Sequence, residues 1–216
     1  MENAEFPRHQ CMVYGGAPSE QLPALVKLIS KNLEARRRCL YLNSPAMVAG
    51  LRSYLTAAGI DVQKKTESGD LIVTSDQGHL VNGKFDGDRM LDLLKTEIFN
   101  AKRDGYSGLW ASGDMSWELG SEINPLKLLN YEQRLEEMFS EYPCLYGVCQ
   151  YHTSTMPPQL LRVGLCQHKA IHGQTLTELN PLYIPEPSLD QFRTETSLEE
   201  IKEMLSRFGD SFVSMQ

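Results

Sequence analysis

The chain has 216 residues and a net charge of −7, from 21 Lys and Arg against 28 Asp and Glu. This length predicts one domain with an appendage, whose core needs no disulfide or metal staple. The acidic balance argues against nucleic-acid binding, because phosphate recognition needs a basic face. No stretch is apolar enough to span a membrane, and the N-terminal residues are too polar for a signal peptide. Five irregularly spaced cysteines are typical of free thiols. We therefore expect a cytoplasmic protein with no membrane or nucleic-acid partner.

Strand-like and helix-like apolar periodicities alternate along the chain, which predicts an α/β fold with a mostly parallel sheet. Strands are expected at 11–14, 39–42, 71–74, 108–113, 145–151 and 170–172. Helices are expected from 19–21 to 33, 47 to 58, 86 or 88 to 105, 124 to 142, and 157 to 165. Asn82-Gly83 indicates a tight turn within a small hairpin.

The composition changes beyond Gly173. Prolines at 181, 185 and 187 indicate a linker, and Ser197 begins an acidic amphipathic helix that reaches Phe208. The expected organisation is a domain over 9–173 and an extension over 174–216. We expect the apolar face of the last helix to dock on its own domain, with docking on a second copy in a homodimer as the alternative.

The loop from Tyr14 to Glu20 follows the first predicted strand, where a doubly wound sheet holds its ligand. A phosphate-binding P-loop requires bare backbone N–H groups, a Lys, and a Ser or Thr for magnesium. This loop has two glycines and Ser19 but no Lys, Pro18 removes one donor, and Glu20 would repel a triphosphate. A tight turn is therefore the preferred interpretation and nucleotide hydrolysis is disfavoured, while the identity of any cofactor stays unknown from the sequence.

Six short segments in a fixed order resemble the MEDS domain, the sensory domain named for methanogens, methylotrophs and the dichloromethane-responsive regulator. They lie at 9–14, 39–42, 105–109, 112–117 (Ser-Gly-Asp-Met-Ser-Trp), 131–132 and 149–151, and the resemblance covers about His9 to Gly173. It implies a RecA/KaiC-like three-layer fold that has lost its P-loop and serves prokaryotic signal transduction or transcription regulation. Small hydrocarbon derivatives are the implied ligands.

Two departures from the family pattern matter. The family usually has Glu at the position of Asp114, so the carboxylate here is one methylene shorter. Members are also commonly fused to a kinase or a DNA-binding module, and about 43 residues after Gly173 are too few for either. We therefore expect output through a separate signalling protein.

The sequence predicts a non-enzymatic small-molecule site at the carboxyl edge of the sheet. The candidate ligand-binding residues are His9, Cys11, Tyr14, Asp114, Met115, Trp117, Cys149, Gln150 and Tyr151. Asp114 could hydrogen-bond a ligand, hold Cys149 or His9, or cap a helix, and the sequence leaves these roles open. Met115 and Trp117 suit a small apolar pocket, although core packing explains them as well.

His9, Cys11, Cys149 and His152 are zinc-ligand types, but the paired spacings of structural zinc sites are absent. We therefore expect a buried thiol and a hydrogen-bonded histidine, and no metal. Two alternatives come from other classes: a degenerate RecA-like protein that binds nucleotide, and a thiol- or metal-dependent enzyme that uses Cys149 with His9, oriented by Asp114.

Three further polar residues have no assigned role at this stage. Glu132 falls within a predicted helix and is expected on its solvated face. His168 and His172 lie near the last predicted strand, and the sequence suggests no partner for either.

Overall fold

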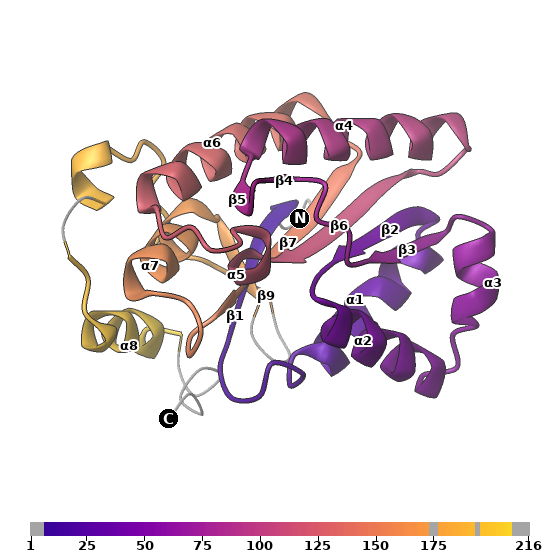
Figure 1. Cartoon of the computed structure of the whole chain (residues 1–216), viewed down its shortest axis with the longest axis horizontal. Coiled ribbons are helices and arrows are strands. Elements are labelled where there is room, and N and C mark those ends of the chain that lie inside the picture. The colour runs from indigo at the N-terminus through magenta and orange to yellow at the C-terminus, as the bar shows by residue number, and fades with distance from the viewer. Residues whose placement is uncertain (1–6, 173–176, 193–194, 209–216) are drawn as a thin grey trace, which may run out of the picture.

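Seven strands form the middle layer of the molecule, in the order β3-β2-β6-β7-β1-β8-β9 (Figure 1). The structure is a computed structural model that describes residues 7–172, 177–192 and 195–208. Neighbouring strands from β3 to β8 are parallel, and β9 is antiparallel to β8. The strands are β1 (His9–Tyr14), β2 (Arg37–Leu42), β3 (Leu71–Thr74), β6 (Gly108–Asp114), β7 (Leu145–His152), β8 (Ala170–His172) and β9 (Thr177–Leu179).

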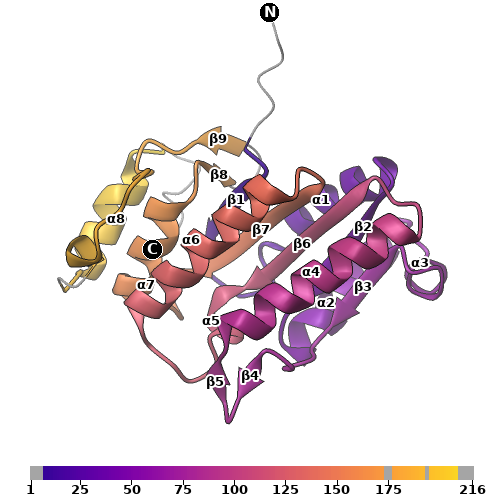
Figure 2. The same ribbon diagram turned by 90° about the horizontal axis from the view of Figure 1, so that it is seen from above.

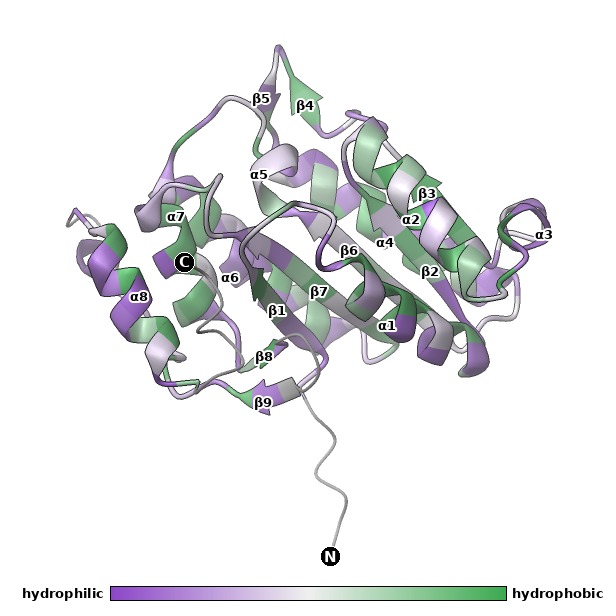
Figure 3. Cartoon of the chain, turned by 90° about the horizontal axis from the view of Figure 1, so that it is seen from below, coloured by the Kyte–Doolittle hydropathy of each residue, from purple (hydrophilic) through white to green (hydrophobic). Residues whose placement is uncertain are grey.

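Helices cover both faces of the sheet, as parallel strands require. One face carries α1 (Leu22–Glu34), α2 (Pro45–Ala57) and α3 (Val62–Glu67). The other carries α4 (Gly87–Arg103), α6 (Pro125–Glu141) and α7 (Pro158–Gln167). Figure 2 shows α4 and α6 lying across the sheet, and Figure 3 shows α1 and α2 on the opposite side. A separate apolar core forms on each face, which confirms the three-layer α/β prediction.

Side-chain caps at the predicted positions begin two of the long helices. Asp86 caps α4 by accepting a hydrogen bond from the Arg89 N–H, and Asn124 caps α6 by accepting one from the Lys127 N–H. A short hairpin of β4 (Leu80–Val81) and β5 (Lys84–Phe85) surrounds the predicted Asn82-Gly83 turn. Both turn residues have positive φ, 53° and 73°, which Asn and Gly tolerate best.

Four short elements escaped prediction: α3, α5 (Met115–Glu118), β9 and the 3-10 turn η1 (Leu189–Phe192). Each is shorter than two helical turns or has only three strand residues, so no apolar period can develop. The strands β1, β2, β6 and β7 also extend one or two residues beyond their predicted ends. Among them, the extension of β1 to His9 matters most for the site.

The last described helix, α8 (Leu198–Ser206), begins with the predicted Ser197 in a complete capping box with Glu200. Its apolar side chains Ile201 and Leu205 join the core beneath α7, which confirms docking on its own domain. The predicted boundary at Gly173 lies outside the described residues. Within the described residues, no helix is both long and apolar enough to cross a membrane.

Candidate functional site

The predicted site residues come from neighbouring strands, because β6, β7 and β1 are adjacent in the sheet. Alternation along each strand nevertheless divides their side chains between the two faces. His9, Cys11, Cys149 and Tyr151 face the α6 and α7 side, whereas Tyr14, Asp114 and Gln150 gather near the carboxyl ends of the strands. The sequence therefore predicted one cluster where the structure has two.

Asp114 is the N-cap of α5, as one of its three predicted roles required. Its Oδ1 accepts hydrogen bonds from the Ser116 N–H at 3.0 Å and the Trp117 N–H at 3.3 Å. Its Oδ2 accepts a hydrogen bond from the Tyr14 hydroxyl. Burial and the adjacent Asp114 carboxylate raise the pKa of the Tyr14 phenol, so it remains a donor. In the described part of the chain, these bonds use both Asp114 oxygens, and His9 and Cys149 lie on the other face.

Gln150 continues this polar group across the sheet. It pairs with Asp114 in the β6–β7 register, as expected for neighbouring strand ends. Its Nε2 donates to Ser112 Oγ at 2.9 Å, and Ser112 Oγ donates to the Val148 carbonyl at 2.7 Å. These side chains are buried, so the bonds satisfy groups that would otherwise be costly to desolvate.

The loop after β1 is filled by its own acidic side chain. Glu20 folds back over Gly16, whose φ is 74°, and accepts a hydrogen bond from the Ala17 N–H at 3.0 Å. The position where a P-loop would present backbone donors to phosphate therefore holds a carboxylate. His152 Nε2 lies 3.0 Å from the Gly16 carbonyl on the same loop, and His152 is not part of the cluster that contains His9 and Cys149.

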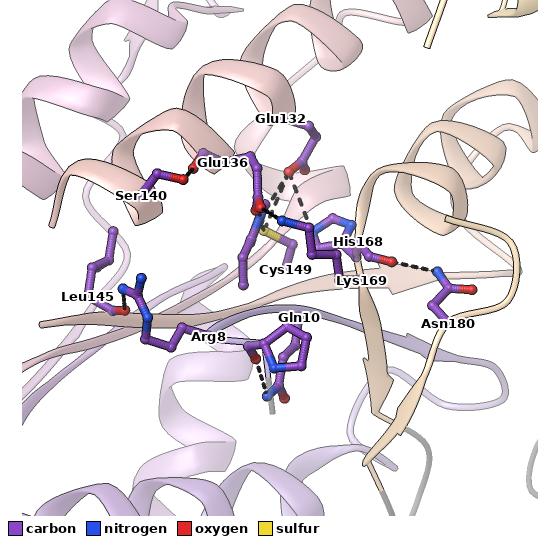
Figure 4. Close-up of polar contacts among 12 residues, drawn as sticks. Arg8, Gln10, Glu132, Glu136, Ser140, Leu145, Cys149, His168, Lys169 and Asn180 are labelled. Atoms are coloured by element: carbon purple, nitrogen blue, oxygen red, sulfur yellow. Dashed lines mark hydrogen bonds and ion pairs between the residues drawn. The ribbon is translucent and has the colours of Figure 1, made fainter. Parts of the chain in front are cut away.

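On the α6 side, four buried side chains converge: His9, Glu132, Cys149 and His168. His9 Nε2 lies 3.6 Å from Cys149 Sγ and 3.4 Å from Glu132 Oε2. His168 Nε2 lies 3.5 Å from the same Glu132 oxygen. Figure 4 shows Glu132 reaching down from α6 towards Cys149 and His168.

Charged groups around this cluster shift the pKa values of its members. Burial alone would lower the pKa of His9, but Glu132 and Glu136 outweigh it and raise that pKa. Burial would raise the pKa of Glu132, yet the two histidines and the Tyr151 hydroxyl lower it. His9 and Lys169 likewise lower the pKa of Glu136 to about 2 against its own desolvation.

Cys149 and His9 meet as the enzyme alternative required, but the rest of that arrangement differs. Glu136, not Asp114, holds the far nitrogen of His9, with Nδ1 to Oε2 at 3.0 Å. Burial and the Glu132 carboxylate raise the pKa of the Cys149 thiol well above its usual value. A buried thiol with a raised pKa is a poor nucleophile, because thiolate is the reactive species.

A small cavity of about 40 Å³ lies between the sheet and helices α4 and α6. Two of the predicted site residues line it, Met115 from α5 and Cys149 from β7. Most other lining residues are apolar: Leu40, Leu42, Met90, Leu94, Ala111, Tyr131, Leu135, Phe139, Leu145 and Val148. Trp117 is outside the lining, and its ring lies edge-on to His79 at 5.6 Å.

Among the residues that the structure describes, Glu118 is the one carboxyl group that lines this cavity. Its Oε1 packs so closely on Gly113 that a Cβ there would lie 1.4 Å away, so any larger residue at this position would displace the carboxyl group. Burial raises the pKa of Glu118 well above its usual value, and the Asp114 and Glu132 carboxylates add to the effect. Burial therefore favours the protonated carboxyl, which can both donate and accept a hydrogen bond.

Sequence reasoning missed Glu132, His168 and Glu118. The expectation of a solvated Glu132 is wrong, since its side chain is fully buried. The stripe of inward residues on α6 held the signal: position 132 is four residues after Leu128 and three before Leu135, on the same helical face. His168, whose partner could not be predicted, follows α7 and meets α6 only through the tertiary fold.

The three-layer arrangement is a RecA-like α/β fold. The flagellar accessory protein FlaH from Methanocaldococcus jannaschii has a similar structure, with a TM-score of 0.53 over 79% of this chain and 72% of that chain. Its sequence identity of 16% shows a shared fold alone.

The family model of the MEDS domain, the methanogen/methylotroph, DcmR sensory domain, matches residues 8–169. The chain therefore belongs to the MEDS family of sensory domains, as the short segments predicted. Comparison with curated protein sequences gives no match.

Proposed function

We propose that this chain is a non-enzymatic sensory module that holds a small apolar molecule in the cavity between the sheet and α4 and α6. The observation that carries the proposal is the cavity itself, about 40 Å³ lined mostly by apolar side chains together with the carboxyl group of Glu118, whose pKa burial raises. A water-sized group needs roughly 10–15 Å³ in this measure, so a molecule of a few heavy atoms fits. The ligand roles of the predicted residues outside this lining remain predictions.

Helix α5 links the cavity to the surface of the molecule through a chain of contacts. Met115 and Glu118 line the cavity, while the Glu118 carbonyl lies 3.1 Å from His79 Nε2. The next residues bridge to the β4–β5 hairpin, through the Lys84–Gly120 pairing and a hydrogen bond from Ser121 Oγ to the Gly83 carbonyl. The hairpin projects from one end of the molecule (Figure 3). Ligand entry would therefore bias a surface element that a signalling partner can contact.

Methyl NMR of the chain labelled at methionine tests this proposal, with dichloromethane and xenon as probes. Met90 and Met115 line the cavity, whereas Met47 packs in the core on the opposite face. We expect both probes to shift the Met90 and Met115 methyl signals in a saturable way and to leave Met47 unchanged.

Ala111→Leu fills the cavity from the β6 side and should abolish these shifts while the chain stays folded. Ala49→Leu, on the exposed face of α2, is the matched control and should bind both probes as the wild type does. Equal shifts at all three methionines, or shifts that survive Ala111→Leu, would contradict binding in this cavity.

A further inference from the structure

The buried cluster of His9, Glu132, Cys149 and His168 offers more than packing. Each residue presents one ligand atom, and these atoms all lie within 4.8 Å of one another. They come from β1, α6, β7 and the residue after α7, so the fold brings together four segments that are distant in sequence. All four side chains are at least nine-tenths buried.

Hydrogen bonds on the far side of three members fix which atom faces the centre. The His9 Nδ1–H donates to Glu136 Oε2 at 3.0 Å, and the His168 Nδ1–H donates to the Gly164 carbonyl at 2.8 Å. Both Nε2 atoms are thereby directed inward. The Tyr151 hydroxyl donates to Glu132 Oε1 and leaves Oε2 pointing at the two imidazoles. Outer partners of this kind are what orient metal-ligating histidines and carboxylates.

The Nε2 atom of His168 faces the centre of the cluster and lacks a hydrogen-bond donor among the described residues. This atom is buried and has no hydrogen-bond partner of either kind in the described part of the chain. A neutral imidazole that donates through Nδ1 carries a lone pair on Nε2, and here that lone pair faces a carboxylate oxygen 3.5 Å away. His168 Nε2 and Glu132 Oε2 are then two acceptors that face each other, and a cation bound between them would satisfy both.

We propose that His9, Glu132, Cys149 and His168 form a binding site for a divalent transition metal of the zinc class. Metal–ligand bonds of 2.0–2.3 Å place the ligands of a tetrahedral ion about 3.3–3.8 Å apart. Four of the six separations between these atoms are 3.4, 3.5, 3.6 and 4.0 Å, the last from Cys149 Sγ to Glu132 Oε2, and all six are within 4.8 Å. Imidazole and thiolate ligands favour zinc-like ions over magnesium or calcium.

The charges also balance once a metal is bound. A carboxylate and a thiolate contribute two negative charges, and two neutral imidazoles contribute none, so a divalent ion leaves the buried site neutral. Binding requires the Cys149 thiol to release its proton to solvent, and any proton on an Nε2 to leave as well. This metal site goes beyond the proposed sensing role, because the cavity could bind its ligand whether or not the metal is present.

Refolding with cobalt tests the site, since the cluster is buried and cobalt reports its own ligands. The full chain is unfolded in denaturant with a reductant and a chelator, exchanged, and refolded with or without Co²⁺. We expect one cobalt per chain, a thiolate-to-cobalt charge-transfer band, the visible bands of a four-coordinate ion, and displacement of all of them by Zn²⁺.

Cys149→Ser should lose the charge-transfer band, whereas Cys39→Ser should keep it, because Cys39 is also a buried cysteine but lies on the opposite face of the sheet. Glu136→Gln should retain the band and weaken affinity about 10–100-fold, as expected for an outer partner. Circular dichroism of each metal-free variant checks folding. Absence of the band in the refolded wild type, or its persistence in Cys149→Ser, would overturn the site. The wild-type measurement decides this even where a variant does not fold.

Discussion

Single side chains set the electrostatics of this core, and Glu118 gives the sharpest test. Its carboxyl keeps its proton in the folded protein above the pH, about 4.5, at which the unfolded chain loses it. The unfolded state therefore gains relative stability as pH rises, and the free energy of unfolding falls by up to about 1.4 kcal/mol per pH unit until the folded group ionises.

Glu118→Gln removes this titration while keeping size and polarity. We expect the variant to gain stability over the wild type progressively as pH rises above about 5, measured by urea unfolding at a series of pH values. Glu137→Gln, on the exposed side of α6, controls for the lost carboxyl. A stability difference that is constant with pH would show that Glu118 is ionised in the folded state.

At the residue scale, the sequence predicted which residues belong to the site better than it predicted which side chains contact one another. It placed Asp114 at a strand end and allowed the N-cap role, because capping depends only on local geometry. It did not show that His9 and Cys149 lie on the opposite face from Asp114, or that Glu132 is buried. The contact between His9 and Cys149 joins residues 140 positions apart, and the contact between Glu132 and Cys149 joins residues 17 positions apart. Long-range contacts of this kind carry no local signal.

Close packing of elements leads to a second prediction, at Gly164 in the middle of α7. A Cβ at this position would lie 2.4 Å from the Tyr151 ring, the same side chain that holds Glu132. Gly164→Ala should therefore destabilise the protein by about 1–3 kcal/mol despite the better helix propensity of alanine.

Gly50→Ala is the matched helix control, because its Cβ would meet only the end of the Leu22 side chain at 3.1 Å. There we expect no loss, or a gain of up to about 1 kcal/mol, in thermal or urea unfolding. Equal effects of the two substitutions would mean that α7 can move away from β7 without cost.

The long elements were predictable because each buries a complete period. The stripe of Met90, Leu91, Leu94, Ile98 and Ala101 predicted α4, and all five residues are buried. In contrast, α5 has only four residues, so its position follows from the Asp114 cap and not from any apolar pattern. The element that lines the cavity was therefore invisible to periodicity.

The whole molecule has the scaffold of RecA-like proteins but a different first loop. Isothermal titration calorimetry with ATP and magnesium should give no binding heat, because the loop has no Lys and the Glu20 carboxylate already accepts the Ala17 N–H. Glu20→Gln should not restore binding, since removing one negative charge supplies no cation. Micromolar affinity for ATP in the wild type would revive the nucleotide-binding alternative.

One side chain, Cys149, belongs to two neighbourhoods at once: it lines the apolar cavity and contributes sulfur to the four-residue cluster. A ligand that binds in the cavity and contacts the Cys149 sulfur would change the coordination geometry of a cobalt ion bound to that sulfur. The colour of the cobalt-loaded protein would then change as the cavity fills, which makes the thiol a built-in optical indicator of occupancy.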